Sequence, residues 1–370
     1  MGGSPGREAS KSILWKRIAV LFLSILLGLL LVEGLARARQ WIRYGSPSGA
    51  AYELTVDPAT GLRIPKPGMK TNHIQIDSRG FRNPEIEMPK PSGRIRLAFV
   101  GASTTFCAEV SSNEATWPEL VCRQLRERFP QLSFDYINAG LPGFDLESSR
   151  KNFEARVLPL EPDVVIYYEA ANDFSMDTRR LARERGVYTG KPEDPSWLAR
   201  RSVVWYLIEK NLAVRERQRG LGQGHTLSYD PGPLARSFES RLVEFLEEAR
   251  RVAPVCAVAT FSHKVRRDQP PDVQLRNCNT SLYYAPYMTV RGILDGWDAY
   301  NQAIRDAAQR TGAILIGGEA EIPADDLHFA DSVHFRDAGA RAQAERITKG
   351  LMASPEFRRF LELRHGAPLG

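Results

Sequence analysis

The sequence predicts a three-layer α/β/α domain built on a parallel sheet of five strands and preceded by one membrane-spanning helix. Two observations predict the domain: five short apolar runs are rich in β-branched residues, and the stretches between them have the periodicity of amphipathic helices. Strands that are apolar throughout and are joined through helices indicate a parallel sheet covered on both faces. A third observation, a long apolar run near the N-terminus, predicts the membrane helix.

The composition is that of a globular chain, with 43% hydrophobic and 25% charged residues over 370 residues. This length suits one large domain or two small ones. The net charge of +6 is modest, and the basic residues are scattered among acids without an aromatic platform, so we predict no nucleic-acid surface. The four cysteines show no CxxC spacing, and no cluster of carboxylates and histidines indicates a metal. We therefore predict neither a metal nor another cofactor.

The N-terminal apolar run covers residues 18–32, reads IAVLFLSILLGLLLV and follows Lys16 and Arg17. It reaches the length of a transmembrane helix when it is extended to residue 36. A signal peptide is the alternative, since Ala36-Arg37-Ala38 resembles a cleavage site. We expect an uncleaved anchor, because the run is long for a signal peptide and arginines flank that site; a buried core helix is a third reading. The charge bias slightly favours a cytoplasmic N-terminus. The rest of the chain would then lie outside the cytoplasm, where a disulfide is allowed but not required.

These features divide the chain into five parts. We expect a cytoplasmic N-terminus at 1–17, the anchor at 18–36, a linker with a small extended module at 37–93, the α/β domain at 94–355 and a C-terminal tail at 356–370.

The elements of the domain follow in order from the pattern. Strands are predicted at 95–100, 134–138, 163–168, 255–260 and 313–316, and helices near 115–129, 146–158, 236–252, 296–310 and 337–351. Two stretches, 177–230 and 262–295, interrupt the alternation, and we expect both to pass over the ligand site. The second carries Tyr283, Tyr284 and Tyr287, a cluster more typical of packing than of a sugar-binding platform.

Polar residues collect where the predicted strands end. The four segments concerned are Gly101-Ala102-Ser103-Thr104-Thr105, Asn138-Ala139-Gly140-Leu141-Pro142-Gly143, Ala170-Ala171-Asn172-Asp173 and, after the last strand, Asp331-Ser332-Val333-His334. Ligands of such folds bind beyond the carboxyl ends of the strands, so we expect these segments to meet at one edge of the sheet.

Together these residues could carry out acyl transfer. A serine such as Ser103 needs a base, which His334 can be, and Asp331 can orient the imidazole. The oxyanion needs donors, for which we name the backbone N–H groups of Ser103 and Gly140 and the amide of Asn172. The purely structural alternatives are helix capping for Ser103 and an ordinary turn for Gly140.

Serine, glycine, asparagine and histidine in this order at successive strand ends resemble the SGNH (GDSL-type) hydrolase superfamily of esterases, lipases and carbohydrate deacylases. The resemblance covers roughly residues 94–350 and implies the flavodoxin-like fold of that superfamily. It also implies a triad of Ser103, Asp331 and His334, with Gly140 and Asn172 completing the oxyanion hole.

Two departures from the family pattern stand out. The usual Gly-Asp-Ser is Gly101-Ala102-Ser103 here, and Ala170 replaces the glycine usual before the asparagine. Neither removes a group that the mechanism uses. The segment 73–86, which contains DSRGFRNPE, resembles one that precedes the serine block in membrane-anchored bacterial members.

A second histidine competes with His334 for the role of base. His328 also has an aspartate, Asp325, three residues before it, so spacing alone does not separate the two pairs. We prefer His334 because an amphipathic helix with Gly339 follows it directly, as the resemblance requires.

We therefore predict a membrane-anchored serine hydrolase in the periplasm or at the cell surface that cleaves acyl esters, with an O-acylated carbohydrate or another cell-envelope compound as substrate. Two alternatives stay open: an acyltransferase that modifies an exported polysaccharide, and a catalytically silent, membrane-tethered binding protein. The sequence does not specify the acyl group, the alcohol, the oligomeric state or any cysteine pairing.

Overall fold

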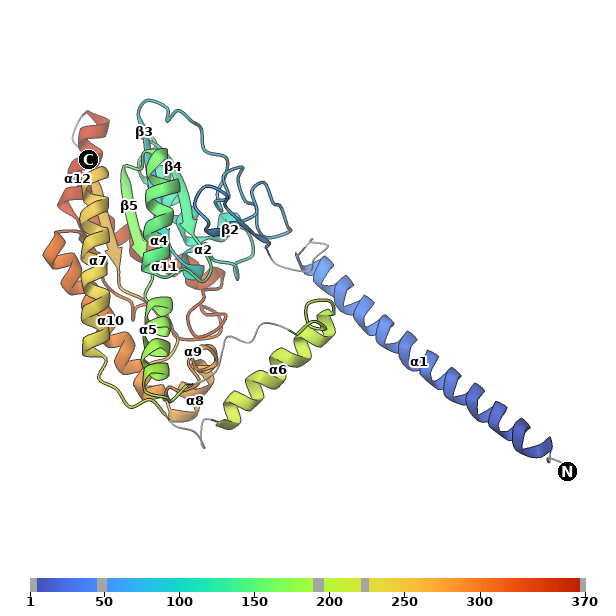
Figure 1. The fold of residues 1–370 in the computed structure, drawn as a ribbon. Helices are drawn as coiled ribbons and strands as arrows, with labels where there is room; N and C mark the ends of the chain where they lie inside the picture. The colour runs from blue at the N-terminus through green and yellow to red at the C-terminus, as the bar shows by residue number, and fades with distance from the viewer. Residues whose placement is uncertain (1–4, 45–51, 189–195, 221–225, 367–370) are drawn as a thin grey trace. The chain divides into compact units, whose positions relative to one another are not determined.

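A computed structural model describes residues 5–44, 52–188, 196–220 and 226–366 (Figure 1). The chain divides into two compact units. The first comprises Met1–Ala50 and Lys191–Glu216, and the second, which contains the α/β domain, comprises Ala51–Gly190 and Arg217–Gly370.

The α/β domain is built on a five-stranded sheet in the order β4-β3-β5-β6-β7, with every pair of neighbours parallel. The strands are β3 (Arg94–Gly101), β4 (Ser133–Gly140), β5 (Val164–Tyr168), β6 (Val255–Ala259) and β7 (Ile314–Ile316). All five predicted strands are confirmed. The strand β4 runs two residues beyond its predicted end, and this extension pairs Gly140 with Gly101.

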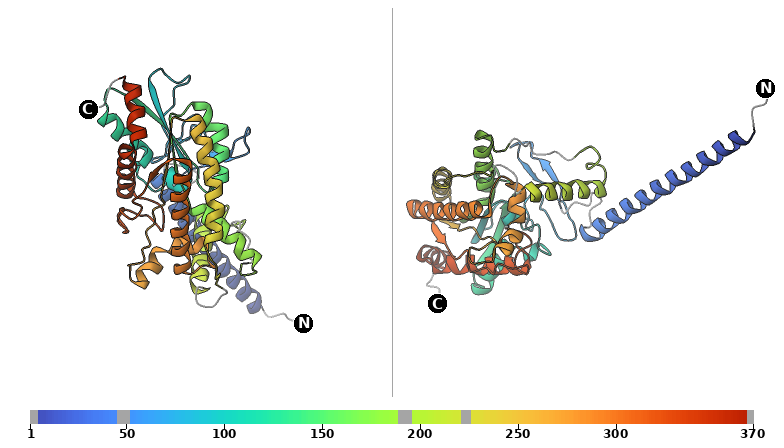
Figure 2. Two further views of the ribbon diagram at one scale, coloured as in Figure 1. Left: turned by 90° about the vertical axis from the view of Figure 1, so that its left-hand side faces the viewer. Right: turned by 90° about the horizontal axis from the view of Figure 1, so that it is seen from below.

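Helices cover both faces of the sheet, which explains why the strands are apolar throughout (Figures 1 and 2). One face carries α4 (Leu146–Asn152), α7 (Gly232–Val252) and α10 (Val290–Thr311); the other carries α3 (Trp117–Arg128), α11 (Asp337–Ala353) and α12 (Pro355–His365). Each predicted helix is present. The one predicted at 146–158 is shorter as an α-helix and continues as a π turn, Phe153–Val157.

The residues predicted as a C-terminal tail, 356–370, include the helix α12. Its start is capped by the side chain of Ser354, which accepts a hydrogen bond from the backbone N–H of Phe357. Phe357 and Leu361 are fully buried. An apolar face at helical spacing therefore makes the helix α12 part of the domain core.

Part of the segment predicted as a linker and module also packs into the second unit. The strands β1 (Leu54–Val56) and β2 (Arg63–Pro65) form an antiparallel pair. Farther along, the fully buried guanidinium of Arg82 donates hydrogen bonds to the carbonyl oxygens of Phe106 and His73, both at 2.9 Å. The segment thus supports the backbone just after β3.

The first unit contains α1 (Pro5–Tyr44) and the part of α6 (Val203–Gly220) that ends at Glu216. Within α1, the 25 residues Trp15–Arg39 form a helix that is long and apolar enough to cross a membrane. A signal sequence passes the same test of length and composition.

Candidate active site

The end of β3 forms a tight turn into the short helix α2 (Ser103–Phe106). A Cβ atom at Gly101 would lie 2.3 Å from the carbonyl oxygen of Tyr168, so only glycine permits this approach. Ala102 occupies the N-cap position of α2, and Ser103 is the first helical residue. The capping alternative for Ser103 therefore does not apply.

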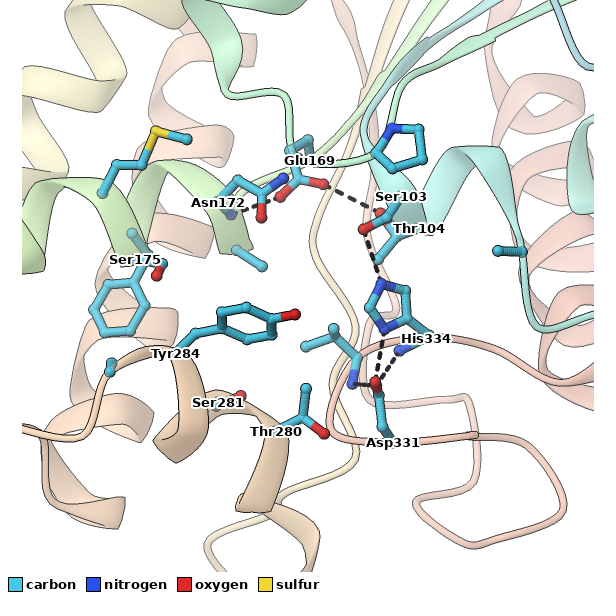
Figure 3. Close-up of a pocket in the computed structure, with 18 of the residues that line it drawn as sticks. Ser103, Thr104, Glu169, Asn172, Ser175, Thr280, Ser281, Tyr284, Asp331 and His334 are labelled. Atoms are coloured by element: carbon cyan, nitrogen blue, oxygen red, sulfur yellow. Dashed lines mark hydrogen bonds and ion pairs between the residues drawn. The ribbon is translucent and has the colours of Figure 1, made fainter. Parts of the chain in front are cut away.

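The three hydroxyls of this turn have three different partners. The Oγ atom of Ser103 lies 2.8 Å from Nε2 of His334 (Figure 3). Thr104 donates to the carboxylate of Glu169 at 3.2 Å, and Thr105 donates to the carbonyl oxygen of Tyr168 at 3.1 Å. Of the three, Ser103 is the one that contacts an imidazole.

The imidazole of His334 is oriented by Asp331. Nδ1 of His334 lies 2.8 Å from Oδ2 of Asp331. The other oxygen of this carboxylate accepts the backbone N–H groups of Val333 and His334, both at 2.9 Å. The carboxylate of Asp331 is thus held by backbone groups of the loop that also carries His334. Its contact with Nδ1 orients the imidazole so that Nε2 is directed at Ser103 (Figure 3).

The competing pair, Asp325 and His328, has the same local geometry as Asp331 and His334 but lies elsewhere in the loop. Nδ1 of His328 lies 2.7 Å from Oδ1 of Asp325. The backbone N–H of Arg336 donates to the carbonyl oxygen of His328, and the N–H of Ala330 donates to that of His334, so the two histidines lie on opposite arms of one loop. Gly339 is required where α11 passes this loop, since a Cβ there would lie 2.1 Å from the His328 carbonyl oxygen.

Three carboxylates influence the protonation of His334. Burial disfavours the imidazolium, but the negative charges of Glu109, Asp331 and Glu169 outweigh it and raise the pKa of His334 to about 9. Desolvation also raises the pKa of Glu169 itself, to about 7. The site therefore favours the protonated histidine at neutral pH.

This pKa predicts a pH dependence. Only the neutral imidazole can accept the proton of Ser103, so kcat/KM should rise with pH and level off only above about pH 9. The variant Glu109→Gln removes one negative charge and should move the midpoint of this rise to lower pH. The control Glu345→Gln, on an exposed position of α11, should leave it unchanged. The measurement is kcat/KM against pH for the three proteins; a wild-type midpoint near the ordinary histidine pKa of about 6.5 would contradict the expectation.

Gly140, predicted as an oxyanion donor, has close neighbours in the packed domain. The backbone N–H of Gly140 donates a hydrogen bond to the side-chain oxygen of Asn138 at 3.1 Å. A Cβ atom on Gly140 would lie 2.5 Å from the backbone nitrogen of Phe106. Gly140 is therefore a packing glycine at the end of β4, where the strand contacts α2. The glycine of this loop that lines the pocket is Gly143, whose φ is +84°. The signal that could have found it is its place in the Pro-Gly turn beyond the strand.

Asn172 lies in the first turn of α5 (Ala171–Glu184) and lines the pocket. One N–H of its amide donates to the carbonyl oxygen of Phe144 at 2.7 Å, which ties α5 to the loop after β4. An asparagine amide carries two N–H donors, so the second can serve a ligand.

Sequence reasoning missed Glu169, which follows β5 directly. Its carboxylate is 1% exposed and accepts two hydrogen bonds, from the hydroxyl of Thr104 at 3.2 Å and from the backbone N–H of Asn172 at 2.8 Å. It therefore joins the helix that carries Ser103 to the helix that carries Asn172 (Figure 3). An acidic residue at the end of a fully apolar strand was the available signal.

These residues surround a cavity of about 480 Å³. Besides Ser103, Asn172, Asp331 and His334, the residues that line it include Tyr52, Arg179, Thr280, Ser281, Tyr284 and Trp297. The stretch 262–295 thus borders the site, as predicted. The stretch 177–230 only partly borders the site. Arg179 on α5 lines the cavity, whereas Lys191–Glu216 belongs to the first unit. Residues 189–195 and 221–225 lie outside the residues that the structure describes. Among the described residues, no group of three or more His, Cys, Asp or Glu could hold a metal ion.

Comparison with protein families decides the identity of this domain, because residues 99–342, more than half of the chain, match the GDSL-like lipase/acylhydrolase family. The chain belongs to the GDSL-like lipase/acylhydrolase family. As a member of this family it is an ester hydrolase with the SGNH fold. A comparison of the hydrolase with curated protein sequences finds no match.

Among solved structures, the hydrolase is similar to the acetylxylan esterase Axe2 from Geobacillus stearothermophilus, with 15% identity and a TM-score of 0.44 over 69% of this chain and 93% of that one. It is also similar to LAE5, an α/β hydrolase from the metagenome of Lake Arreo, with 14% identity and a TM-score of 0.43 over 69% of this chain and 94% of that one.

Proposed function

We propose that the hydrolase cleaves acyl esters through Ser103, His334 and Asp331. The observation that carries this proposal is the 2.8 Å contact between Ser103 Oγ and His334 Nε2, with Asp331 bound to the other ring nitrogen. In the first step, Ser103 attacks the ester carbonyl while His334 takes its proton. The imidazolium then gives this proton to the departing alcohol, and water, activated by the same imidazole, releases the acid from the acyl-enzyme.

The tetrahedral intermediates carry a negative oxygen that needs donors. We assign this role to the backbone N–H of Ser103, the backbone N–H of Gly143 and the second amide N–H of Asn172. The N–H groups in the first turn of a helix have no acceptor within that helix, which leaves that of Ser103 available. Each such donor is typically worth about 2.7–4 kcal/mol of barrier.

The substrate class that we propose is an O-acylated carbohydrate or another compound of the cell envelope. Two features of the cavity support it. The aromatic side chains of Tyr52 and Tyr284 line the cavity, and so do the hydroxyl-bearing residues Thr280 and Ser281. A sugar ring presents both apolar C–H faces and hydroxyl edges, so this mixture suits it.

We also propose that α1 is an uncleaved anchor and that the catalytic unit lies outside the cytoplasm. The helix α1 continues without a break through the possible cleavage site at Ala36–Ala38 and ends at Tyr44. A helix of this length spans a bilayer with residues to spare.

A panel of esters tests the proposed activity and substrate. The full-length protein in detergent should be labelled by a fluorophosphonate and should release acid from acylated sugars with a higher kcat/KM than from p-nitrophenyl esters of the same acid. Absence of labelling would contradict the proposed nucleophile. Labelling combined with preference for the p-nitrophenyl esters would retain the chemistry and overturn the carbohydrate as substrate.

A further inference from the structure

The first unit exposes a short apolar segment that the hydrolytic chemistry does not use. Residues 203–208 at the start of α6 read VVWYLI, six apolar residues in a row. The side chains of Trp205, Tyr206, Leu207 and Ile208 are each about two-fifths exposed, and Trp197, just before the helix, is 62% exposed. A helix that is apolar all round is normally covered, by protein or by lipid.

The start of α6 is bound to the end of the apolar run in α1. The carboxylate of Glu33 accepts hydrogen bonds from the hydroxyl of Ser202 at 2.8 Å and from the backbone N–H groups of Val203 and Val204 at 3.0 and 3.1 Å. It thereby satisfies N–H groups of the first turn of α6, where a negative charge is also favoured by the helix dipole.

One turn farther along α1, Arg37 completes this junction. It donates to the carbonyl oxygen of Arg201 at 2.7 Å and to the carboxylate of Glu33 at 2.7 Å. Glu33 and Arg37 are the first charged residues after the apolar run 18–32. If α1 spans the bilayer, they mark its boundary, and α6 starts at that level.

We propose that the segment 197–212 lies on the membrane surface, with Trp197 and the apolar start of α6 inserted among the lipids. The proposal rests on the proposed anchor. Three observations favour lipid as the occupant: the junction with the apolar part of α1, the exposure of consecutive apolar side chains, and the presence of two tryptophans and a tyrosine, which are enriched at the interface between bilayer and water.

The insertion has a topological consequence. Lys191–Glu216 interrupts the catalytic unit between Gly190 and Arg217, while the anchor precedes Ala51. With α6 at the membrane, the chain would connect the catalytic unit to the bilayer at three places rather than one. Such a unit has less orientational freedom than one on a single tether, because three linked chain segments restrict each other.

Single reporters in the full-length protein test the proposal. Cysteine is introduced at Leu207 in α6, at Leu26 in the middle of the anchor, or at Leu363, which is 74% exposed on α12. Each is labelled with a nitrobenzoxadiazole dye, with the unsubstituted protein as the blank for the four buried native cysteines. The proteins are reconstituted in phosphatidylcholine vesicles that contain nitroxide-labelled phosphatidylcholine, and aqueous iodide is the second quencher.

The expected result is strong nitroxide quenching at Leu26 and quenching at Leu207 at least about threefold above that at Leu363. Without quenching at Leu26, the anchor is wrong and the proposal falls with it. If the dye at position 26 is quenched but the dye at position 207 is quenched no more than that at position 363, the proposed membrane-surface segment is overturned and the anchor stands. Protection of Leu207 from both quenchers would show that protein covers it, which also overturns the proposal.

A second comparison tests the junction itself. The variant Glu33→Ala removes the three hydrogen bonds to the start of α6. In the protein that carries the dye at position 207, this variant should lower the nitroxide quenching. In the protein that carries the dye at position 26, it should leave the quenching unchanged. The matched control Arg39→Ala alters a charged residue of α1 outside the junction. Equal quenching in all of these proteins would contradict the role of Glu33 in holding α6 at the membrane.

Discussion

Replacement of Ser103 by Ala is expected to abolish ester hydrolysis and leave the fold intact. The hydroxyl oxygen is the only heavy atom removed, and loss of a triad serine typically costs about 10⁶-fold in kcat. The neighbouring hydroxyls do not offer a substitute, because Thr104 donates to Glu169 and Thr105 to the Tyr168 carbonyl oxygen. The measurements are kcat on an ester substrate, labelling by a fluorophosphonate, and circular dichroism.

Ser175 provides the matched control, since it is a second serine that lines the same cavity from α5. Ser175→Ala should retain labelling and change kcat by less than about tenfold. Substantial activity in a folded Ser103→Ala protein would place the nucleophile elsewhere and would remove the main support for the proposed mechanism.

The second large effect separates the two histidines. His334→Ala is expected to lower kcat by about 10⁴-fold or more, because it removes the base that lies 2.8 Å from Ser103. His328→Ala makes the same change in a residue with the same spacing to an aspartate, and should cost less than about tenfold. The two variants are matched in chemistry and in local sequence, so the comparison isolates contact with Ser103.

Asp331→Asn should fall between these two variants, since it misorients the imidazole of His334 without removing it. Measurement of kcat for the three variants, with circular dichroism as the check of folding, is sufficient. An inactive but folded His328→Ala protein, together with an active His334→Ala protein, would show that the proposed triad is wrong even though the family is right.

Glu169 lies outside the proposed triad but is coupled to it. It holds Thr104 and the backbone of Asn172, and its charge contributes to the raised pKa of His334. A carboxylate in this position therefore links the placement of the proposed nucleophile and of a proposed oxyanion donor to the protonation of the proposed base. This coupling is a reason to expect the activity of the hydrolase to depend strongly on pH.

The sequence by itself determined the architecture of the domain. Apolar runs at β3 to β7 and amphipathic stretches between them encode local structure, because burial on both faces of a parallel sheet leaves a continuous apolar signature. The same pattern located the strand ends and so led to Ser103 and Asn172, whereas the preference for His334 over His328 came from the resemblance to the family. Strand ends are visible in sequence because polar and turn-forming residues cluster where burial stops.

Only the tertiary structure decided what depends on contacts between distant segments. Asp325/His328 and Asp331/His334 are alike in spacing and in local geometry, and only the position of Ser103, more than two hundred residues earlier, separates them. The side-chain partners of Glu169 likewise lie on other segments of the chain.

The choice between Gly140 and Gly143 has the same origin. Both are glycines near the end of β4, and sequence does not show where the strand stops pairing. In the structure, β4 pairs with β3 as far as Gly140, which places that residue inside the packed layer and Gly143 at the cavity. The apolar periodicity of a sequence indicates which residues of one segment are buried. The candidate active site forms where several segments meet, and these contacts depend on how the whole chain packs.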